Sequence, residues 1–425
     1  MRDKKNKILI ICPSMWPKMN SWGETQRMYY LANCLAQHGW EVYTVSPKFK
    51  EKEEEPKREK KYTCYFLGDG RRLMAPEIKK NNKFYELFRR TIAKILTPII
   101  SWVYNEPDCR EGIYKQLWIW RYKKKICDLI DDIGIDTVII SMPAFVLIKL
   151  GRDIYKKNSG VRIIYDYRDP WHLWNQKKNL AYYTEKKFFR YADKIVGFSD
   201  TFLKDMIHIM GVSANKMATV YNGYSERDWR DTEGKKTYRK WEKRNKLCLV
   251  FTGNIILLDR KDNYRNPYNL IEIVSKIPEV ELFFIGVKEQ RENRIENNVH
   301  YIGNVSQEES FEYMRMSDVL ISIHDTRDAS GKYIVSGKFY DYMRSGKIIW
   351  HIGAEHDLMT KLIQKYKLGV WCRNEKSELE KTLEKILQYW KKDTLRQLRI
   401  CDIEEISIFS RENQNKKYID ILGGN

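Results

Sequence analysis

The sequence lacks the long apolar stretch that a membrane-spanning helix requires. Such a helix needs about 20 consecutive apolar residues, and the longest apolar run, residues 135–150, is interrupted by Asp136, Pro143 and Lys149. A second apolar run, residues 8–13, follows a basic N-terminus, but it is shorter than the apolar core of roughly 7–15 residues in a secretion signal. We therefore interpret residues 7–12 as a buried strand and expect a cytoplasmic protein.

The residue patterns of several common sites are missing as well. The eight cysteines form no CxxC pair and the seven histidines form no HxH or HxxxH pair, so we expect free thiols in a reducing compartment and no structural zinc site. No GxGxxG motif follows the first strand, which disfavours a standard dinucleotide-binding fold. No Asp-x-Asp metal motif occurs in a clear strand context.

Acidic residues are in the minority. The 425 residues include 77 Lys+Arg and 57 Asp+Glu, which leaves a formal charge of +20. This balance favours an anionic partner: nucleic acid, an acidic membrane surface or a phosphorylated substrate. Apolar residues make up 43% of the chain, too many for a disordered protein, and the length predicts two or three domains.

Strand and helix patterns alternate along the chain. Residues 7–12, 24–38 and 41–45 read as a strand, a helix and a strand, which is a βαβ unit. Further strands are predicted at residues 136–141, 162–167, 194–199, 218–221, 247–252, 280–285, 300–303, 319–323 and 348–352. A polar passage, residues 225–245, interrupts the alternation and is the best linker candidate. The pattern predicts two tandem doubly wound α/β domains, with a ligand at the carboxyl ends of the strands, in the cleft between the domains.

One region departs from this alternation. Residues 71–125 carry 14 Lys+Arg and 5 Asp+Glu, a net charge of +9. Within it, residues 83–96 form a predicted amphipathic helix with a basic face made of Lys83, Arg89, Arg90 and Lys94. Such a helix can lie in a membrane interface. It can equally pack on its own domain with a solvated basic face, and the sequence leaves both readings open.

Two segments carry most of the chemistry. Gly23 follows the first strand and opens a helix, whose N-terminal N–H groups can hold an anion. In the second segment, Ser336 is a possible N-cap, Gly337 allows close approach of the backbone and Lys338 adds a charge for a phosphate. Asp341 lies one turn later and can accept hydrogen bonds from sugar hydroxyls. The alternatives are a simple turn at Gly23 and an ordinary capped helix at residue 337.

Taken in order, segments along both halves of the chain resemble the family-four, retaining glycosyltransferases of the GT-B fold, in particular the type that builds bacterial surface polysaccharides. The resemblance rests on ICPSMWPKMNSWGETQ near the N-terminus, DYRDPW at residues 166–171, VYNGY at 220–224, FTGNI at 251–255, LFFIG at 282–286, VHYIGNVSQEESFEYM from 299, and the tail at 409–422. Their order and spacing together are more specific than any one segment.

The resemblance implies two Rossmann-like domains that face a cleft. Residues 1–224 would form the acceptor-binding domain, with the basic insertion at about 71–125, and residues 225–245 the linker. Residues 246–408 would bind the nucleotide-sugar, and residues 409–425 would form a helix that crosses back to the first domain.

The resemblance also implies a donor site. Ser336, Gly337 and Lys338 would hold the diphosphate, and Asp341 would take the place of the second Glu of the family's Glu-x7-Glu element, which holds the ribose. Tyr333 stands where the first Glu would be. The remaining donor-site candidates are Gly23, Gly253, Asn254 and Arg265, where Asn254 replaces the family's Arg and Arg265 is preferred to Arg260 and Lys261 as the nearby cation.

Arg168 and Asp169, at the end of the predicted strand 162–167, are the candidate catalytic residues, expected to orient donor or acceptor. The alternative for this pair is a local salt bridge that closes the turn. His172 is a possible proton carrier by type and location.

The resemblance thus predicts a glycosyltransferase, hexosyl or N-acetylhexosaminyl, that extends a lipid-linked oligosaccharide during capsule, O-antigen or exopolysaccharide assembly. We expect no metal or other cofactor, no nucleic acid partner, and a peripheral position on the inner face of the plasma membrane, where the basic insertion meets anionic lipid. Two alternatives stay open: a GT-B-like sugar-nucleotide epimerase, which needs no membrane helix, and a non-catalytic polyanion-binding protein.

Overall fold

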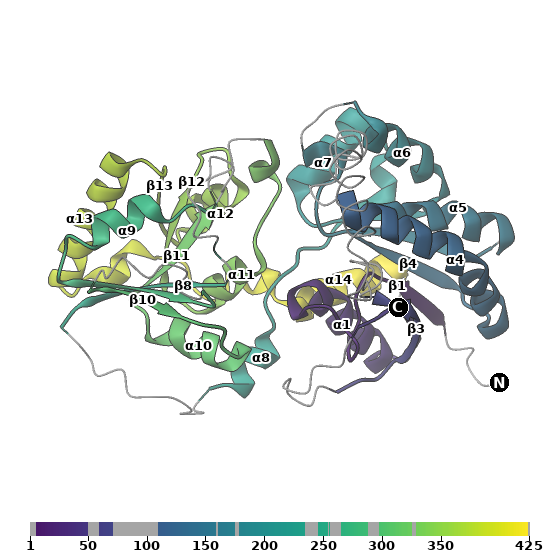
Figure 1. The fold of residues 1–425 in the computed structure, drawn as a ribbon, viewed down its shortest axis with the longest axis horizontal. Coiled ribbons are helices and arrows are strands. Elements are labelled where there is room, and N and C mark those ends of the chain that lie inside the picture. Colours follow the sequence, from purple (N-terminus) through teal and green to yellow (C-terminus); the bar gives the residue numbers. More distant parts are fainter. Residues whose placement is uncertain are drawn as a thin grey trace, which may run out of the picture. The chain divides into compact units, whose positions relative to one another are not determined.

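The computed structural model describes residues 6–49, 59–70, 109–158, 160–174, 178–233, 245–253, 255, 265–287, 297–324 and 329–423. The chain divides into two compact units (Figure 1): unit 1 is Met1–Asn222 with Asn415–Asn425, and unit 2 is Gly223–Gln414. The sequence-based boundary was placed after residue 224. The predicted basic helix, with Lys83, Arg89, Arg90 and Lys94, lies outside the described residues, as does Asn254.

Unit 1 is built on a parallel sheet of seven strands in the order β3-β2-β1-β4-β5-β6-β7. The strands are β1 Lys7–Ile11, β2 Glu41–Lys48, β3 Thr63–Asp69, β4 Thr137–Met142, β5 Arg162–Tyr167, β6 Lys194–Gly197 and β7 Met217–Thr219. The four residues after Lys7 in β1 are fully buried, because helices cover both faces of a central parallel strand. This is why the strand reads as an unbroken apolar run.

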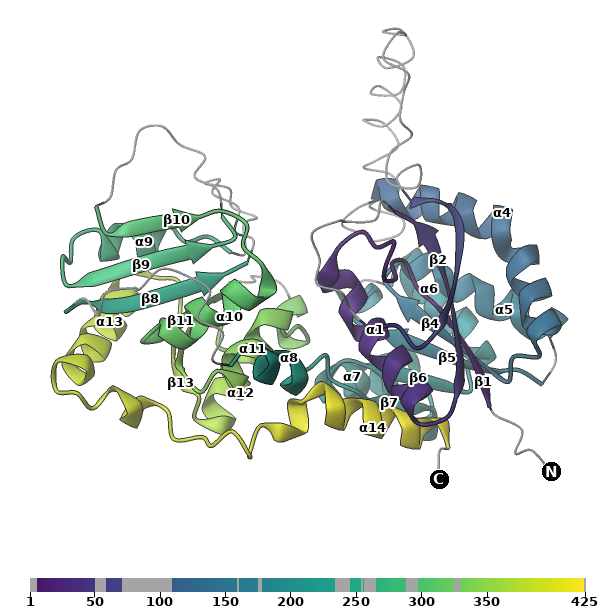
Figure 2. The same ribbon diagram turned by 90° about the horizontal axis from the view of Figure 1, so that it is seen from below.

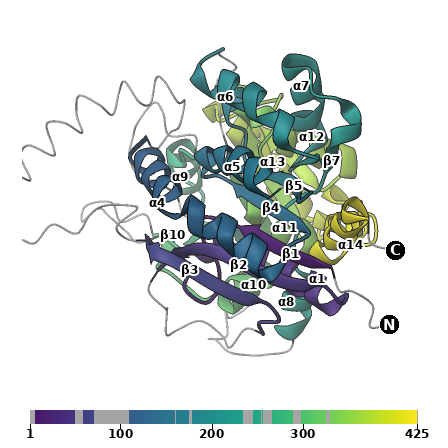
Figure 3. The same ribbon diagram turned by 90° about the vertical axis from the view of Figure 1, so that its right-hand side faces the viewer.

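The described helices of unit 1 are α1 Trp22–Gln37, α4 Cys109–Ile133, α5 Ile148–Lys157, α6 Leu180–Phe188, α7 Asp200–Met210 and most of α14 Arg411–Leu422. Helices α1 and α14 lie on one face of the sheet and α4 and α5 on the other (Figure 3). Tyr418 and Leu422 of α14 pack into the same core as Met28 and Leu35 of α1, and Figure 2 shows α14 running beside α1. The last turn of α14 is tied to β5, since Arg162 donates to the carbonyls of residues 421 and 422 at 2.7 and 2.8 Å.

Unit 2 is also built on a parallel sheet, which has six strands in the order β10-β9-β8-β11-β12-β13. The strands are β8 Leu247–Thr252, β9 Val280–Ile285, β10 Val299–Ile302, β11 Val319–His324, β12 Ile348–Gly353 and β13 Gly369–Cys372. The helices are α8 Glu226–Asp231, α9 Tyr268–Val274, α10 Gln307–Met316, α11 Gly337–Arg344, α12 Leu358–Tyr366 and α13 Lys376–Lys391. A core of alternate strand residues lies beneath α9 and α13.

Short 3₁₀ helices complete the two units. They are η1 Phe145–Leu147, η2 His172–Trp174, η3 Phe189–Tyr191, η4 Ala214–Lys216, η5 Ala329–Lys332, η6 Leu395–Leu398 and η7 Ser407–Phe409. Within the described residues, no helix has the length and apolar character needed to cross a membrane.

The predicted pair of doubly wound α/β domains is confirmed. In both sheets the strand order reverses beside the first strand, between β1 and β4 and between β8 and β11, and ligands of such sheets bind outside the carboxyl ends of the strands at this point. Two strands, β3 and β13, were not predicted. The start of the predicted linker, residues 226–231, forms helix α8, whose residues 226–233 show no apolar period because Trp229 is their one large apolar side chain.

Candidate active site

The carboxyl end of β8 is shaped by glycine. Gly253 directly follows β8 and adopts a φ of +97°, a conformation that side-chain-bearing residues rarely take. Gly286 follows the neighbouring strand β9, and a Cβ atom there would lie 3.4 Å from the Cα atom of Gly253. The two strand ends therefore approach closely, and the backbone at Gly253 is accessible from the side of Lys338, whose Cδ would lie 3.7 Å from a Cβ at residue 253.

Lys338, in the first turn of α11, extends over this strand end. Its Nζ donates to the carbonyl of Thr252 at 2.8 Å and lies 3.3 Å from the centre of the Phe251 ring. Burial holds the pKa of Lys338 well below its ordinary value, and the nearby charge of Arg265 lowers that pKa further. Of the donor-site candidates, Lys338 thus lies beside Gly253, and the charge of Arg265 acts on Lys338.

Helix α11 is fixed to the sheet. The hydroxyl of Tyr342 accepts a hydrogen bond from the backbone N–H of Thr252 at 2.8 Å. Ser336 is the N-cap, but its side chain makes no capping hydrogen bond and instead lies 3.8 Å from the sulfur of Met359. No capping side chain therefore competes with an anion for the first N–H groups of the helix, beginning at Gly337.

Asp341 lies one turn after Lys338 in α11. Its Oδ1 accepts a hydrogen bond from Nε1 of Trp229 at 3.4 Å. Burial raises the pKa of Asp341 to about 7, although the charge of Arg411 and the Trp229 hydrogen bond oppose the increase. Tyr333, in the place of the family's first Glu, is fully buried, and a tyrosine offers no carboxylate to a sugar hydroxyl.

In unit 1, Arg168 does not have the free guanidinium expected of a catalytic residue. It donates to the carbonyl oxygens of Met142 at 3.3 Å and Pro143 at 2.9 Å, and also to that of Glu24. The side chain therefore ties the turn after β5 to β4 and α1. The salt bridge to Asp169 that we considered as an alternative is not formed either.

Asp169 is the more available member of the pair. No hydrogen bond or ion pair reaches its carboxylate within the part of the chain that the structure describes. Burial raises the pKa of Asp169 to about 6, although the charges of Arg168 and Arg27 act to lower it. A carboxylate that is poised near neutrality can take part in proton transfer.

His172, considered above as a proton carrier, is buried. Its Nδ1 bonds to the Glu185 carboxylate, and its backbone N–H donates to the same oxygen at 3.3 Å. The imidazole thus joins the turn after β5 to α6. Gly23, the second residue of α1, has open space around its Cα, as a helix start near a ligand would have.

Sequence reasoning missed the main ion pair of unit 1. Arg27 and Asp166 are both buried and form two hydrogen bonds, of 2.7 Å (Nη2 to Oδ1) and 3.1 Å (Nε to Oδ2). Arg27 also donates to the carbonyl of Val220 at 2.9 Å. The sequence did hold one indication of this pair, because Arg27 lies on the apolar face of α1 with Met28 and Leu31. No group of three or more His, Cys, Asp or Glu side chains within the described ranges could hold a metal ion.

Three solved structures share this fold over nearly the whole chain. Anabaena HepE in complex with UDP-glucose is 12% identical, with 99% of this chain and 100% of that chain covered and a TM-score of 0.60. WaaG, a glycosyltransferase involved in lipopolysaccharide biosynthesis, is 11% identical, with 98% and 100% covered and a TM-score of 0.55. A Listeria monocytogenes protein assigned as a UDP-N-acetylglucosamine 2-epimerase is 12% identical, with 98% and 95% covered and a TM-score of 0.55. No curated protein sequence matches the chain.

The architecture is the GT-B fold, with two Rossmann-like units. Residues 23–227 match the family described as Glycosyltransferase Family 4. This match covers just under half of the chain, and the GT-B fold expected from the resemblance is confirmed.

Proposed function

We propose that the protein transfers a hexosyl or N-acetylhexosaminyl group from a nucleoside diphosphate donor to a lipid-linked oligosaccharide, during assembly of a bacterial capsule, O-antigen or exopolysaccharide. The observation that carries the donor assignment is the position of Lys338 beside Gly253, where the charge of Arg265 also acts on it. Two cations close to a helix N-terminus and a strand end suit a diphosphate. The neighbours HepE, bound to UDP-glucose, and WaaG support the donor class and the setting.

We propose a retaining reaction without a metal. The bond between the anomeric carbon and the diphosphate oxygen breaks, and its electron pair leaves with the diphosphate. The acceptor oxygen attacks the anomeric carbon from the same face, and its proton passes to the leaving phosphate. Lys338, Arg265 and the N-terminus of α11 stabilise the charge that develops on the diphosphate. Asp169 orients the acceptor, and Asp341 binds the ribose.

A ligand panel tests the donor assignment. A ligand that binds only the folded protein stabilises it by about 2.7 kcal/mol at a hundred times its dissociation constant. We expect UDP-, GDP-, ADP- or dTDP-sugars of one nucleotide class to raise the melting temperature. A flat panel at millimolar ligand contradicts the proposal. Conversion of UDP-N-acetylglucosamine to its 2-epimer without an acceptor contradicts it too, and favours the epimerase alternative.

We further propose that the protein binds the inner face of the plasma membrane, where a lipid-linked acceptor is present. The net charge of +9 in residues 71–125 supports this, as does α4, on which Leu117 is 54% and Trp120 73% exposed. Arg121 and Lys124 are exposed nearby on the same helix. Tryptophan beside basic residues is typical of membrane-interface segments.

Sedimentation with vesicles of anionic phospholipid tests this placement. Charge reversal at Arg89, Arg90 and Lys94 is expected to leave the protein in the supernatant. Charge reversal at Lys381 and Lys385, which are exposed on α13, is the matched control and should leave sedimentation unchanged. Equal sedimentation of all three proteins contradicts the proposal.

A further inference from the structure

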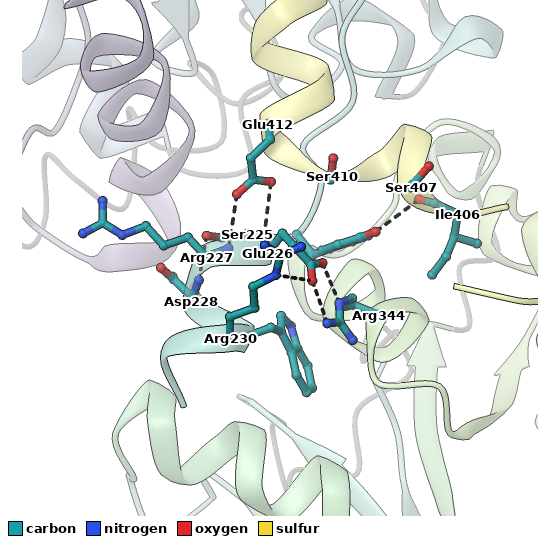
Figure 4. Close-up of polar contacts among 12 residues, drawn as sticks. Ser225, Glu226, Arg227, Asp228, Arg230, Arg344, Ile406, Ser407, Ser410 and Glu412 are labelled. Carbon is teal, nitrogen blue, oxygen red and sulfur yellow. Dashed lines mark hydrogen bonds and ion pairs between the residues drawn. The ribbon is translucent and has the colours of Figure 1, made fainter. Parts of the chain in front are cut away.

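Helix α8 lies in the segment that the sequence analysis predicted to be a linker, yet it is firmly held (Figure 4). Ser225 caps it by accepting from the N–H of Asp228 at 3.1 Å. The carboxylate of Glu412 accepts from the backbone N–H groups of Glu226 and Arg227 at 3.3 and 3.2 Å. Three of the first N–H groups of this short helix thus have partners, which fixes where the helix begins.

A bidentate ion pair joins α8 to α11. Nε and Nη2 of Arg344 donate to the two carboxylate oxygens of Glu226 at 2.6 and 2.7 Å (Figure 4). The paired hydrogen bonds of arginine and a carboxylate fix orientation as well as distance. Arg344 is the last residue of α11, three residues after Asp341. The position of α8 is therefore set relative to Asp341.

The indole of Trp229 is held in one orientation within α8. The side chain is 1% exposed, and its ring is stacked on Phe311 at a centroid distance of 4.4 Å and an angle of 18°. The guanidinium of Arg315 lies 4.9 Å from the centre of the ring. Arg315 also donates to the Trp229 carbonyl at 2.8 Å. Helix α10, which carries Phe311 and Arg315, thus fixes the direction of the indole N–H.

That N–H points at Asp341. Nε1 of Trp229 donates to Oδ1 at 3.4 Å, and no second hydrogen bond to the Asp341 carboxylate occurs among the residues that the structure describes. An indole nitrogen can only donate. Its hydrogen bond therefore favours the ionised form of the Asp341 carboxylate and is made to Oδ1. Oδ2 is left to accept hydrogen bonds from a ligand.

We propose that Trp229 is a positioning residue, which holds the Asp341 carboxylate so that Oδ2 binds the ribose hydroxyls of the donor nucleotide, and that it thereby sets the preference for ribonucleotides over 2′-deoxyribonucleotides. This inference rests on the proposed function, since it assumes that the nucleotide binds at α11. The segment that contributes this residue lies 112 positions before Asp341 in the sequence.

Calorimetric titration with UDP and 2′-deoxyuridine diphosphate tests the inference, because removal of one hydroxyl isolates the contact with Asp341. The wild type is expected to bind UDP about tenfold more tightly, as one hydrogen bond to a charged group allows. Trp229→Phe keeps the stacked ring and removes the N–H. It is expected to lower this ratio to about twofold, with affinity for the deoxynucleotide unchanged.

The matched control is Trp350→Phe. Trp350 is also fully buried in unit 2, and its indole N–H donates to the sulfur of Cys372 at 3.2 Å, in the core rather than at α11. This variant should keep the wild-type ratio. If Trp229→Phe keeps it as well, or weakens both nucleotides equally, the inference is wrong while the proposed function stands. If the wild type binds neither nucleotide nor their guanosine and adenosine counterparts, the proposed function itself is wrong.

The pH dependence of UDP binding gives a second readout that a loss of packing would not change. Asp341 accepts more strongly from the ribose when it is ionised, and burial raises its pKa to about 7. The charged groups that act on it are Arg411 of α14, which lowers the pKa, and Asp228 of α8, which raises it. Removal of the Trp229 N–H raises the pKa further, so the acid limb of UDP affinity should move to higher pH in Trp229→Phe. An unmoved limb contradicts the inference.

Discussion

The two units share one strand order, but Arg27 and Arg168 of unit 1 have other kinds of partner than Lys338 of unit 2. In unit 1, Arg27 is paired with Asp166, and Arg168 donates to three backbone carbonyls. In unit 2, Lys338 has a carbonyl and an aromatic ring as neighbours, and no carboxylate pairs with it within the described ranges. A buried cation without a counterion is costly unless a ligand completes it. Arg27 and Arg168, which have partners within the protein, therefore stabilise the fold, whereas Lys338 is suited to bind an anionic ligand.

The acidic residues Asp166 of unit 1 and Asp341 of unit 2 also differ in how far their hydrogen bonds are satisfied within the protein. Asp166 of unit 1 accepts from Arg27 at both oxygens and from the hydroxyl of Ser141 at 3.3 Å, so its hydrogen-bonding capacity is used within the protein. Among the described residues, Asp341 of unit 2 accepts one hydrogen bond, from Trp229. A charged side chain with few hydrogen bonds inside the protein, such as Asp341, is therefore the better candidate for contact with a ligand.

The largest expected effect is on stability, in unit 1. Arg27→Met should lower the free energy of unfolding by about 3–5 kcal/mol, because it leaves the buried Asp166 carboxylate without its counterion. Urea denaturation of both proteins measures the difference. Lys338→Met is the matched control and should unfold at the wild-type urea concentration or above, since it removes a desolvated amine. If Lys338→Met is instead less stable than Arg27→Met, then Lys338 stabilises the fold more than Arg27 does, and the proposed difference between the two units is wrong.

The next effect is on ligand binding, in unit 2. Lys338→Ala is expected to weaken UDP binding about tenfold or more, the value of a lost hydrogen bond to a charged group. Calorimetric titration measures it. Lys361→Ala, at an exposed position on α12, serves as the control and should bind as the wild type does. If the two variants bind UDP equally well, Lys338 is not part of the donor site.

A smaller effect concerns Asp169 and pH. Because the pKa of Asp169 is raised to about 6, the folded protein holds this proton more tightly than the unfolded chain, with a pKa of about 3.9. Stability is therefore lost as the pH rises from about 4 to 6. Asp169→Asn should gain stability, on the order of 1 kcal/mol, at pH 8 but not at pH 4.

Urea denaturation at the two pH values checks this prediction, with the exposed Asp132→Asn as a control that should show no such difference. A gain at pH 4 equal to that at pH 8 would mean that the charge of Asp169 is not the cause. In that case Arg27 and Arg168 would still neutralise the Asp169 carboxylate, although both have partners within the protein. The cations of unit 1 would then differ less from Lys338 of unit 2.

What the sequence could predict depends on local pattern. Buried central strands are continuous apolar runs, and the start of α11 has its glycine and lysine in adjacent positions, so both were predictable. The missed strands β3 and β13 are edge strands, which are partly exposed and lack such runs. Partners distant in the chain were out of reach. Nothing near Arg168 indicates that a carbonyl 144 residues away accepts from it, or that Trp229 in a polar stretch donates to Asp341.

The smallest expected effect is that of metal removal. If Lys338, Arg265 and the N-terminus of α11 stabilise the diphosphate, a divalent cation has little left to contribute. The dissociation constant of UDP should then change by less than about twofold when EDTA replaces magnesium chloride in the titration. In Lys338→Ala, where one cation has been removed, magnesium should restore part of the lost affinity. If the wild-type protein needs magnesium to bind UDP, then Lys338 and Arg265 do not suffice to hold the diphosphate. The difference between Lys338 and the internally paired arginines of unit 1 would then not explain where the nucleotide binds.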